Sequence, residues 1–346
     1  MKDLVISGNI YDNGRMVRGA YSLSKERFLD SAAQYDLEGT LIRAPVNFHT
    51  HLGDSFIGAE PEGSIKDIVG PGGLKIRELE KAPAELITKN ISKSIDFMKA
   101  QGTLAFFDFR ESGLKGLKLA PRFSGISGFF LTRPSTEGEI LPLLDMSAGF
   151  GVSAISDYQF SYLSKLSNIA HSEKKLFALH FSEDKRERVE MLESLHPDYV
   201  IHCIETTDHD LSVLSKLGTP VVITPRSNVF HGKRPDYSRL FTSGLTVLLG
   251  TDNVFITEPI IMGEAEFLYR YQRKLNRLSP ETVLSTIIEN PRYVMKRLGL
   301  KVDEEKFLFY PGEFLTPYQI VTRPNYYKRT VISKKGDRIS YISRKH

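Results

Sequence analysis

The feature that most constrains the fold is an alternation of short apolar runs with amphipathic helical stretches along most of the 346 residues. Eight such runs occur, each of a length that suits a buried strand. Eight strands alternating with helices predict an α/β fold, a (β/α)8 TIM barrel with a parallel sheet. The strands are expected at about 40–48, 102–108, 124–131, 149–155, 175–180, 199–203, 220–224 and 245–250, and helices at about 84–100, 161–172, 185–195, 208–217 and 259–275.

An open, doubly wound sheet would show the same alternation of strands and helices. Such sheets commonly bind nucleotides through a glycine-rich turn directly after the first strand. No turn of that kind follows the run that ends near residue 48. The barrel is therefore favoured.

The two ends of the chain follow a different pattern, with short alternating runs separated by turns. Residues 4–41 have this character, and so do 307–310, 319–322, 330–333 and 339–342. We expect them to be short, largely antiparallel strands. The sequence thus predicts a small β-sandwich domain built from residues 1–42 and 303–346, with the barrel domain of residues 43–302 inserted between its halves.

A long segment from Leu52 to Pro83 follows the first barrel strand and contains Gly70-Pro71-Gly72-Gly73. Connections of this length in a compact domain are often functional. At the carboxyl end of a barrel strand the segment would overhang the active site, so we interpret it as a lid. A plain surface loop is the alternative.

Composition and charge narrow the classes of function. The single cysteine, Cys203, excludes an internal disulfide and suits a reducing compartment. No apolar run approaches the roughly 20 residues needed to cross a bilayer, and the start of the chain lacks the apolar core of a signal peptide. The net charge of +4 is spread along the sequence, with no basic stripe. We expect a cytoplasmic protein that binds neither membrane nor nucleic acid.

Histidines stand at the ends of several predicted strands, which is where barrel enzymes carry their catalytic groups. His49 and His51 end the first strand, and residues two apart on a strand point to the same side. Two imidazoles from one strand end can therefore reach one metal ion. His180 ends the fifth strand, and Glu183 lies three residues further on, where a turn could bring it back over the barrel mouth.

The sixth and eighth strands complete this set. His202 ends the sixth apolar run, and Asp252 follows the eighth. A buried structural histidine is the usual explanation for one such residue, but it explains three such strand ends poorly. Neutral imidazoles together with a carboxylate suit Zn²⁺ or Fe²⁺. The pattern therefore indicates a metal-dependent enzyme.

The ordered motifs resemble the amidohydrolase superfamily, and within it the aminohydrolase branch of deaminases and chlorohydrolases. The resemblance covers about residues 41–300. It rests on Asn47-Phe48-His49-Thr50-His51-Leu52, His180-Phe181-Ser182-Glu183, His202-Cys203, Pro225-Arg226-Ser227-Asn228, Gly250-Thr251-Asp252-Asn253, and Asn290-Pro291 opening a helix that ends at Leu298-Gly299-Leu300. It also implies the split β domain.

The resemblance implies a role for each residue at the barrel mouth. His49, His51, His180 and Asp252 would bind one metal ion, zinc or alternatively iron. His202 would contact the attacking water or the substrate, and Glu183 would carry the proton. Members with two metals use a carboxylated lysine at the end of the fourth strand, and residues 151–156 contain no lysine. This difference argues for one metal.

Two departures from the family pattern concern the substrate and the first strand. Ala44-Pro45-Val46 stands where a proline-glycine often precedes the histidine pair. Several nucleoside-type deaminases have another histidine at the position of Glu205. The second departure leaves the substrate open.

The expected reaction is deamination of an amino-substituted heterocycle, such as a purine, pyrimidine or pterin, by metal-activated hydroxide with release of ammonia. Hydrolysis of a cyclic amide or imidazolone, or hydrolytic dechlorination, is the alternative within the superfamily. A non-catalytic metal-binding homologue is the alternative from another class. The substrate is expected to be a small molecule, and two copies of the chain could pair. Candidate substrate contacts are Arg110, Glu111, Asp157, Arg226 and Asn228.

Overall fold

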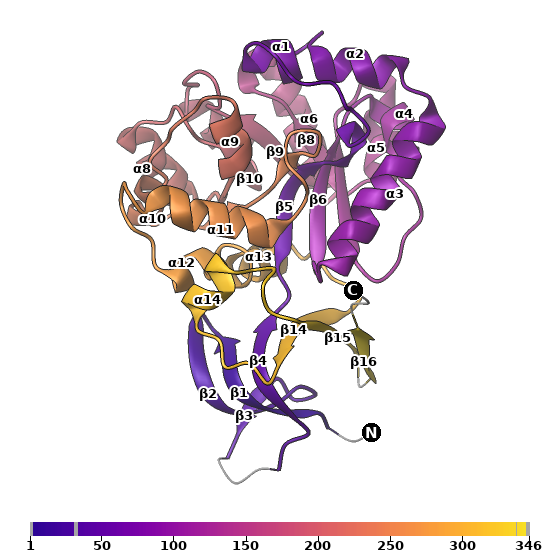
Figure 1. The fold of residues 1–346 in the computed structure, drawn as a ribbon. Coiled ribbons are helices and arrows are strands. Elements are labelled where there is room, and N and C mark those ends of the chain that lie inside the picture. The colour runs from indigo at the N-terminus through magenta and orange to yellow at the C-terminus, as the bar shows by residue number, and fades with distance from the viewer. Residues whose placement is uncertain (1–2, 31–33, 337, 344–346) are drawn as a thin grey trace.

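The larger of two sheets is parallel and curls upon itself (Figure 1). The computed structural model describes the chain except residues 1–2, 31–33, 337 and 344–346. Among the described residues, no helix is long and apolar enough to cross a membrane. The strands of the large sheet are β5 (Val46–His51), β6 (Ala105–Arg110), β7 (Ser127–Thr132), β8 (Gly149–Val152), β9 (Leu176–Phe181), β10 (Tyr199–His202), β11 (Val221–Ile223), β12 (Val247–Leu249) and β13 (Asp252–Asn253).

The two edges of this sheet belong to one continuous segment of chain. β12 pairs with β11 and β13 pairs with β5, and only Gly250 and Thr251 lie between them. The Gly250 amide donates to the Ile223 carbonyl at 3.0 Å, and the Thr251 amide donates to the His49 carbonyl at 2.8 Å. A Cβ on Gly250 would lie 2.6 Å from the Cβ of His49, so only glycine fits there. The predicted α/β fold with a barrel-like parallel sheet is confirmed.

Helices and short connecting helices alternate with these strands along the chain. Two of them, α3 and α8, have the predicted bounds, whereas α7 begins later than predicted. The elements are η1 (Leu52–Asp54), α1 (Ile65–Val69), α2 (Leu74–Lys81), α3 (Ala84–Ala100), α4 (Gly113–Leu117), η2 (Glu137–Glu139), α5 (Ile140–Met146), η3 (Ile155–Asp157), α6 (Phe160–Ser172), α7 (Glu190–Leu195), α8 (Asp208–Leu217), α9 (Pro225–Phe230), α10 (Ser238–Thr242), α11 (Ile261–Gln272), α12 (Pro280–Ser285) and α13 (Glu289–Arg297).

Successive side chains of a strand point to opposite faces of the sheet. The apolar residues of the barrel strands therefore divide into an outer cluster, which packs against the helices, and an inner cluster. On β10, Val200 belongs to the outer cluster, whereas Tyr199 and Ile201 belong to the inner cluster. Aromatic rings fill the inner cluster: the Phe48 and Phe107 rings stack with centroids 4.0 Å apart. Because the interior is packed with side chains, the chemistry is confined to the ends of the strands.

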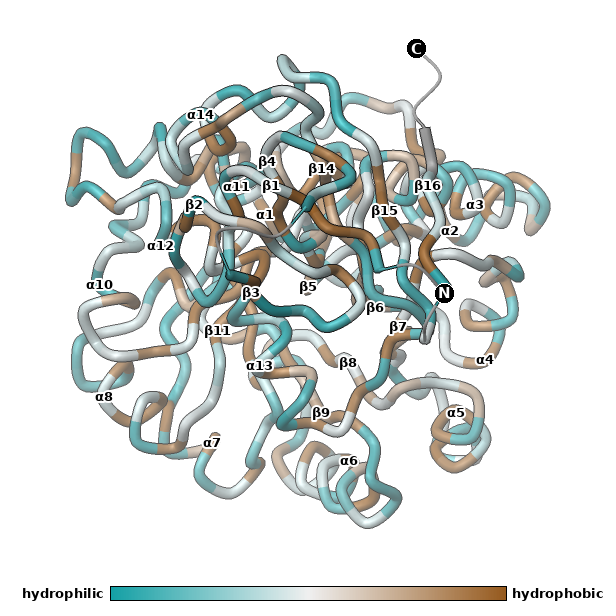
Figure 2. Tube along the Cα trace, turned by 90° about the horizontal axis from the view of Figure 1, so that it is seen from below, coloured by the Kyte–Doolittle hydropathy of each residue, from teal (hydrophilic) through white to brown (hydrophobic). Residues whose placement is uncertain are grey.

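The smaller sheet joins the two ends of the chain, as predicted. It has the order β16-β15-β14-β4-β1-β2-β3, so β4 lies between strands from both ends. The described residues form one seven-stranded sheet here, and the predicted sandwich is not confirmed; the domain boundaries stay a prediction. Figure 2 views the molecule from the side of this sheet. Its strands are β1 (Val5–Asp12), β2 (Arg15–Ser22), β3 (Arg27–Leu29), β4 (Leu37–Arg43), β14 (Glu305–Pro311), β15 (Thr330–Lys335) and β16 (Arg338–Ser343).

One predicted strand is wrong. Residues 319–322 lie in a helix, α14 (Pro317–Thr322), and not in a strand. The Thr316 side chain accepts from the Gln319 amide, the Gln319 side chain accepts from the Thr316 amide, and Pro317 occupies the first turn. This capping box starts a helix and outweighs the strand preference of the β-branched Ile320 and Val321.

Candidate metal centre and active site

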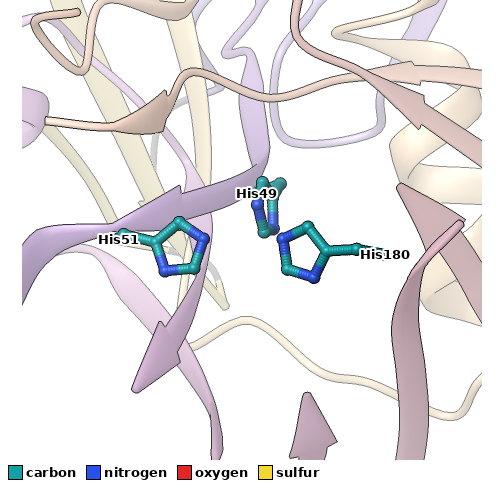
Figure 3. A group of neighbouring side chains, drawn as sticks. All are labelled: His49, His51 and His180. Atoms are coloured by element: carbon teal, nitrogen blue, oxygen red, sulfur yellow. The ribbon is translucent and has the colours of Figure 1, made fainter. Parts of the chain in front are cut away.

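Three histidines converge at the carboxyl ends of β5 and β9. One ring nitrogen from each of His49, His51 and His180 lies within 4.8 Å of the others. Figure 3 shows the three rings facing one another, with His49 between the other two. The strand-end positions predicted from the sequence are thus brought together around one point.

The second nitrogen of two of these rings is held by the surrounding protein. His51 Nδ1 lies 2.8 Å from Glu111 Oε1, and His180 Nδ1 lies 3.0 Å from the Val152 carbonyl oxygen. A histidine that donates from Nδ1 to such an acceptor presents Nε2 as a free lone pair, which is the usual arrangement of a metal ligand. These contacts orient His51 and His180 toward the shared point.

His49 provides the test of whether a metal fits this site. Its side chain is fully buried, and neither ring nitrogen has a hydrogen-bond partner. Leaving a buried polar group unpaired costs about 1–3 kcal/mol, so an unpaired imidazole needs an explanation. A divalent cation bound by the three histidines would take one of the two His49 nitrogens as a ligand atom. The residues present therefore fit the metal that the fold implies.

Asp252 contributes a carboxylate to the same point from β13. Its Oδ1 lies 3.4 Å from His49 Nε2 and 3.5 Å from His51 Nε2, and its Oδ2 accepts from Ser227 Oγ at 2.7 Å. Burial alone would raise the pKa of Asp252. However, contact with His49 and the proximity of His202 hold the pKa well below its usual value. Asp252 is therefore ionised at neutral pH, as a ligand should be.

The histidines of the site are held neutral. Burial lowers the pKa of His51 to about 4, lowers that of His180 well below its usual value, and also lowers the pKa of His49 and His202. A metal ligand must present an unprotonated nitrogen. The imidazoles of the site are therefore unprotonated, and able to bind a metal, at neutral pH.

A second group of residues, Glu183, His202 and Asp252, shares the carboxylate with the first. One ligand atom from each lies within 4.8 Å of the others, and His202 Nε2 lies 3.5 Å from Glu183 Oε1. His202 Nδ1 faces Asn228 Oδ1 at 3.1 Å, and Asn228 Nδ2 donates to the Tyr237 hydroxyl at 2.9 Å. These contacts direct Nε2 of His202 toward the mouth.

Glu183 has the opposite electrostatic character to Asp252. Burial, followed by repulsion from the Asp252 carboxylate, raises the pKa of Glu183 to about 8. The side chain remains 20% exposed. A carboxyl group with these properties carries a proton at neutral pH and can donate it to a bound molecule.

Left-handed backbone conformations place these side chains. The φ angles of Ser182, His202, Cys203 and Asp252 are +49°, +75°, +54° and +62°. Such angles are uncommon outside glycine and cluster at functional sites. After β9, the Ser182 amide donates to Glu187 Oε2, and the Glu187 amide donates to Ser182 Oγ. This turn directs Glu183 back over the mouth.

The five predicted substrate contacts have different surroundings. Glu111 and Asn228 contact site histidines. The buried Arg110 pairs with Asp108 at 3.2 Å, and Arg226 pairs with the buried Glu264 and so joins α9 to α11. Asp157 is exposed at the end of η3. Contact of any of the five with a substrate stays a prediction.

Sequence reasoning missed four residues around the site. Ser227 and Thr224 contact Asp252 and His202, and their place beside Asn228 in the α9 motif was the available signal. Lys75 and Asp54 lie in or next to the long segment after β5. No pattern in the sequence distinguishes Lys75 from the exposed lysines near it.

Comparisons with known proteins agree with this fold and site. No family model matches the chain. A protein of Archaeoglobus fulgidus named "Putative aminohydrolase" is 28% identical over 267 residues, which cover 76% of this chain and 78% of the relative. The zinc-bound adenosine deaminase of Xanthomonas campestris has a similar structure, with a TM-score of 0.77, 14% identity, and coverage of 99% of this chain and 93% of that one.

A second solved structure extends the range of chemistry found on this fold. Atrazine chlorohydrolase from Arthrobacter aurescens, complexed with zinc, has a TM-score of 0.71 and 13% identity, and the match covers 99% of this chain and 94% of that one. At these identities the structures establish the fold. The relatives named aminohydrolase agree with the resemblance that the ordered motifs indicated. The chain is thus similar in sequence to proteins named aminohydrolase, and similar in fold to a zinc-bound deaminase and a zinc-bound chlorohydrolase.

Proposed function

We propose that the chain is a metal-dependent aminohydrolase that removes the amino group from an electron-poor heterocycle, such as a purine, pyrimidine or pterin, and releases ammonia. The aminohydrolase relatives support an enzyme that hydrolyses carbon–nitrogen bonds other than peptide bonds. The observation that carries the proposal is a group of three histidines, contacted by the Asp252 carboxylate, beside a carboxyl group of raised pKa, Glu183.

One divalent ion, Zn²⁺ or alternatively Fe²⁺, would be held by His49, His51, His180 and Asp252. When bound, such an ion acts as a Lewis acid and lowers the pKa of a coordinated water from 15.7 to about 7. The zinc-bound deaminase and chlorohydrolase of similar fold support zinc. The composition of the cluster, nitrogen donors with one carboxylate, supports the same choice.

Glu183 and His202 are the groups that would handle protons. Glu183 carries a proton at neutral pH and can donate it to the ring nitrogen beside the carbon under attack; it can then carry the next proton to the departing amine. His202, held by Asn228, directs Nε2 toward the position of the attacking oxygen. Asp252, which is ionised, can accept a proton from that oxygen. These roles follow from the protonation states that the site imposes.

A dechlorination of a chlorinated heterocycle is the second candidate. The structural likeness to atrazine chlorohydrolase favours including it. The same cluster would serve, and only the leaving group would differ. Hydrolysis of a cyclic amide or imidazolone would likewise use this cluster.

The test is a screen of the zinc-loaded protein against paired substrates. Amino-substituted purines, pyrimidines and pterins are compared with their chloro analogues, and both ammonia and chloride are measured. Ammonia release that is absent from Glu183→Gln at equal zinc content supports the proposal. Chloride release alone, or ring opening without ammonia, would replace deamination by one of the other reactions.

The cellular location of the enzyme is also a proposal. We place it in the cytoplasm, where its single cysteine would remain reduced. Cys203 is buried, and burial raises the pKa of its thiol, which makes it a poor nucleophile. We expect small-molecule substrates, and pairing of two copies stays a prediction.

A further inference from the structure

The segment between β5 and α3 places one charged side chain inside the protein. Helices α1 and α2 lie at the end of the molecule opposite the seven-stranded sheet (Figure 1). The side chain of Lys75, in the first turn of α2, is only 5% exposed, whereas that of Lys81 at the other end of the same helix is 72% exposed. Burial of an ammonium group costs several kcal/mol unless partners compensate it. The partners of Lys75 therefore decide what it does.

The partners of Lys75 lead directly to a proposed metal ligand. Lys75 Nζ forms a close ion pair with Glu111 Oε1. The same oxygen lies 2.8 Å from His51 Nδ1. Lys75, Glu111 and His51 thus form a continuous chain of contacts from α2 to the histidine cluster, with all three side chains at least nine-tenths buried.

A second carboxylate extends these contacts to the other side of the cluster. Asp54 Oδ2 lies 3.8 Å from Lys75 Nζ and accepts from Asn253 Nδ2 at 2.8 Å. Asp54 Oδ1 accepts from the Val254 amide at 2.9 Å. Asn253 directly follows Asp252 in the chain. The ammonium group therefore lies between the connections that follow β5, β6 and β13.

We propose that Lys75 is a positioning residue that couples closure of the 55–83 segment to metal binding. By holding the Glu111 carboxylate on His51 Nδ1, it keeps His51 Nε2 directed at the metal position. In return, a metal bound by His51 fixes Glu111 as the docking point for α2. Coupling of this kind is reciprocal, so each event stabilises the other.

A simple packing role would not need this arrangement. A buried ion pair is often no more stabilising than apolar side chains of similar size. A methionine at position 75 would fill the same space without a charge. The presence of lysine at position 75, paired with the carboxylate that contacts a proposed ligand, indicates a function for the charge.

The experiment compares zinc affinity in wild type, Lys75→Met, Lys75→Arg and Lys81→Met, measured by competition with a chromophoric chelator. Contacts behind a metal ligand are commonly worth 10–100-fold in affinity, so we expect Lys75→Met to bind zinc about tenfold more weakly. Lys75→Arg should recover most of the loss, and the exposed-site control Lys81→Met should bind as wild type does.

Limited proteolysis of the 55–83 segment supplies the second readout, which a merely structural role would not move. Zinc should slow cleavage of this segment in wild type and have little effect on it in Lys75→Met. If Lys75→Met does not fold, Glu111→Gln takes its place, because it keeps an acceptor for His51 but removes the charge that Lys75 binds.

Unchanged zinc affinity, together with equal protection of the segment by zinc in wild type and variant, would overturn the coupling. The inference rests on the proposed metal site, but the two can fail separately. A wild-type protein that binds no zinc refutes the metal site itself. A wild type that binds zinc alongside an unaffected variant refutes only the role of Lys75.

Discussion

The two halves of the barrel mouth are built differently. The half from β5, β6 and β13 carries His49, His51 and Asp252, of which none is more than 7% exposed. The half from β9 and β10 carries Glu183, with a side chain 20% exposed, and His180, which is half-buried. Helix α2 extends over the first half through Lys75, whereas Glu183 borders solvent.

Apart from His180, which is also a proposed metal ligand, this difference separates the residues that would hold a metal from the residue that would move a proton. A ligand must be rigid and unprotonated, so the first half supplies neutral imidazoles and a carboxylate whose pKa is held well below its usual value. A proton carrier must reach the substrate and hold a proton, so the second half supplies a carboxyl group with a pKa of about 8. Two carboxylates of one site are thus shifted in opposite directions by their surroundings.

The largest effect is expected from Glu183→Gln, which should remove the proton carrier but leave the four proposed metal ligands intact. Loss of a general acid typically costs 10²–10⁴ in rate, so kcat should fall by about three orders of magnitude with one zinc per chain retained. Steady-state kinetics with zinc analysis measures both. Asp184→Asn, at the more exposed neighbour, is the matched control. Activity within a few fold of wild type would remove Glu183 from the mechanism.

The raised pKa of Glu183 predicts the pH dependence of the reaction. The ordinary pKa of a glutamate is 4.5, and here it is raised to about 8, so the proton-bearing form dominates below pH 8 and is lost above it. The value of kcat/KM should therefore fall about tenfold per pH unit above this point. A pH profile checks the midpoint. An activity that keeps rising through pH 9 contradicts the assignment.

A smaller loss is expected when the support of His202 is removed. Asn228→Ala deletes the acceptor 3.1 Å from His202 Nδ1, which should lower kcat about 10–100-fold while zinc stays bound. Tyr237→Phe deletes only the contact behind Asn228 and should cost less. Equal losses in the two variants, or loss of zinc in Asn228→Ala, would show that Asn228 acts on the fold and not through His202.

The smallest effect is expected at an ion pair in the segments that follow β9 and β10. Arg186 donates twice to the buried Asp210, at 2.8 Å in both contacts, and its side chain is 51% exposed. We expect Arg186→Met to lower the free energy of unfolding slightly without changing kcat. Arg188→Met, at an arginine 79% exposed, is the control.

The same ion pair has a defined pH window. Contact with Arg186 lowers the pKa of Asp210 from 3.8 to about 2, so its contribution is complete above pH 4 and is lost as the pH falls through 2. The stability difference between wild type and Arg186→Met, measured by urea denaturation, should shrink between pH 4 and pH 2. A difference that stays constant over this range would mean that the pair is not its source.

Much of the fold could be predicted because the strand and helix patterns are local. The eight apolar runs and the bounds of α3 and α8 follow from the periodicity of the sequence. The error at 319–322 arose from weighting Ile320 and Val321 above the capping box that begins at Thr316. The joining of the two ends in one sheet also agrees with expectation, but whether a strand faces a second layer depends on contacts that no local pattern encodes.

The site was predictable to the extent that strand ends determine it. His49, His51, His180 and Asp252 come together because parallel strands place their carboxyl ends at one rim. The surroundings of the ligands were not predictable, since they depend on contacts across the barrel. Arg110 and Arg226 hold neighbouring segments through Asp108 and Glu264. Lys75 reaches the cluster from α2, a helix whose sequence is typical of a surface helix.

The central claim is that His49, His51 and Asp252 of the first half, together with His180 of the second half, hold one divalent metal. The most direct measurement is metal content by elemental analysis, on protein purified without chelators, in wild type and His49→Ala. We predict about one zinc or iron ion per wild-type chain, and loss of that ion in the variant. A wild type free of metal, or a metal content that His49→Ala leaves unchanged, would contradict the site and leave a non-catalytic role for the barrel.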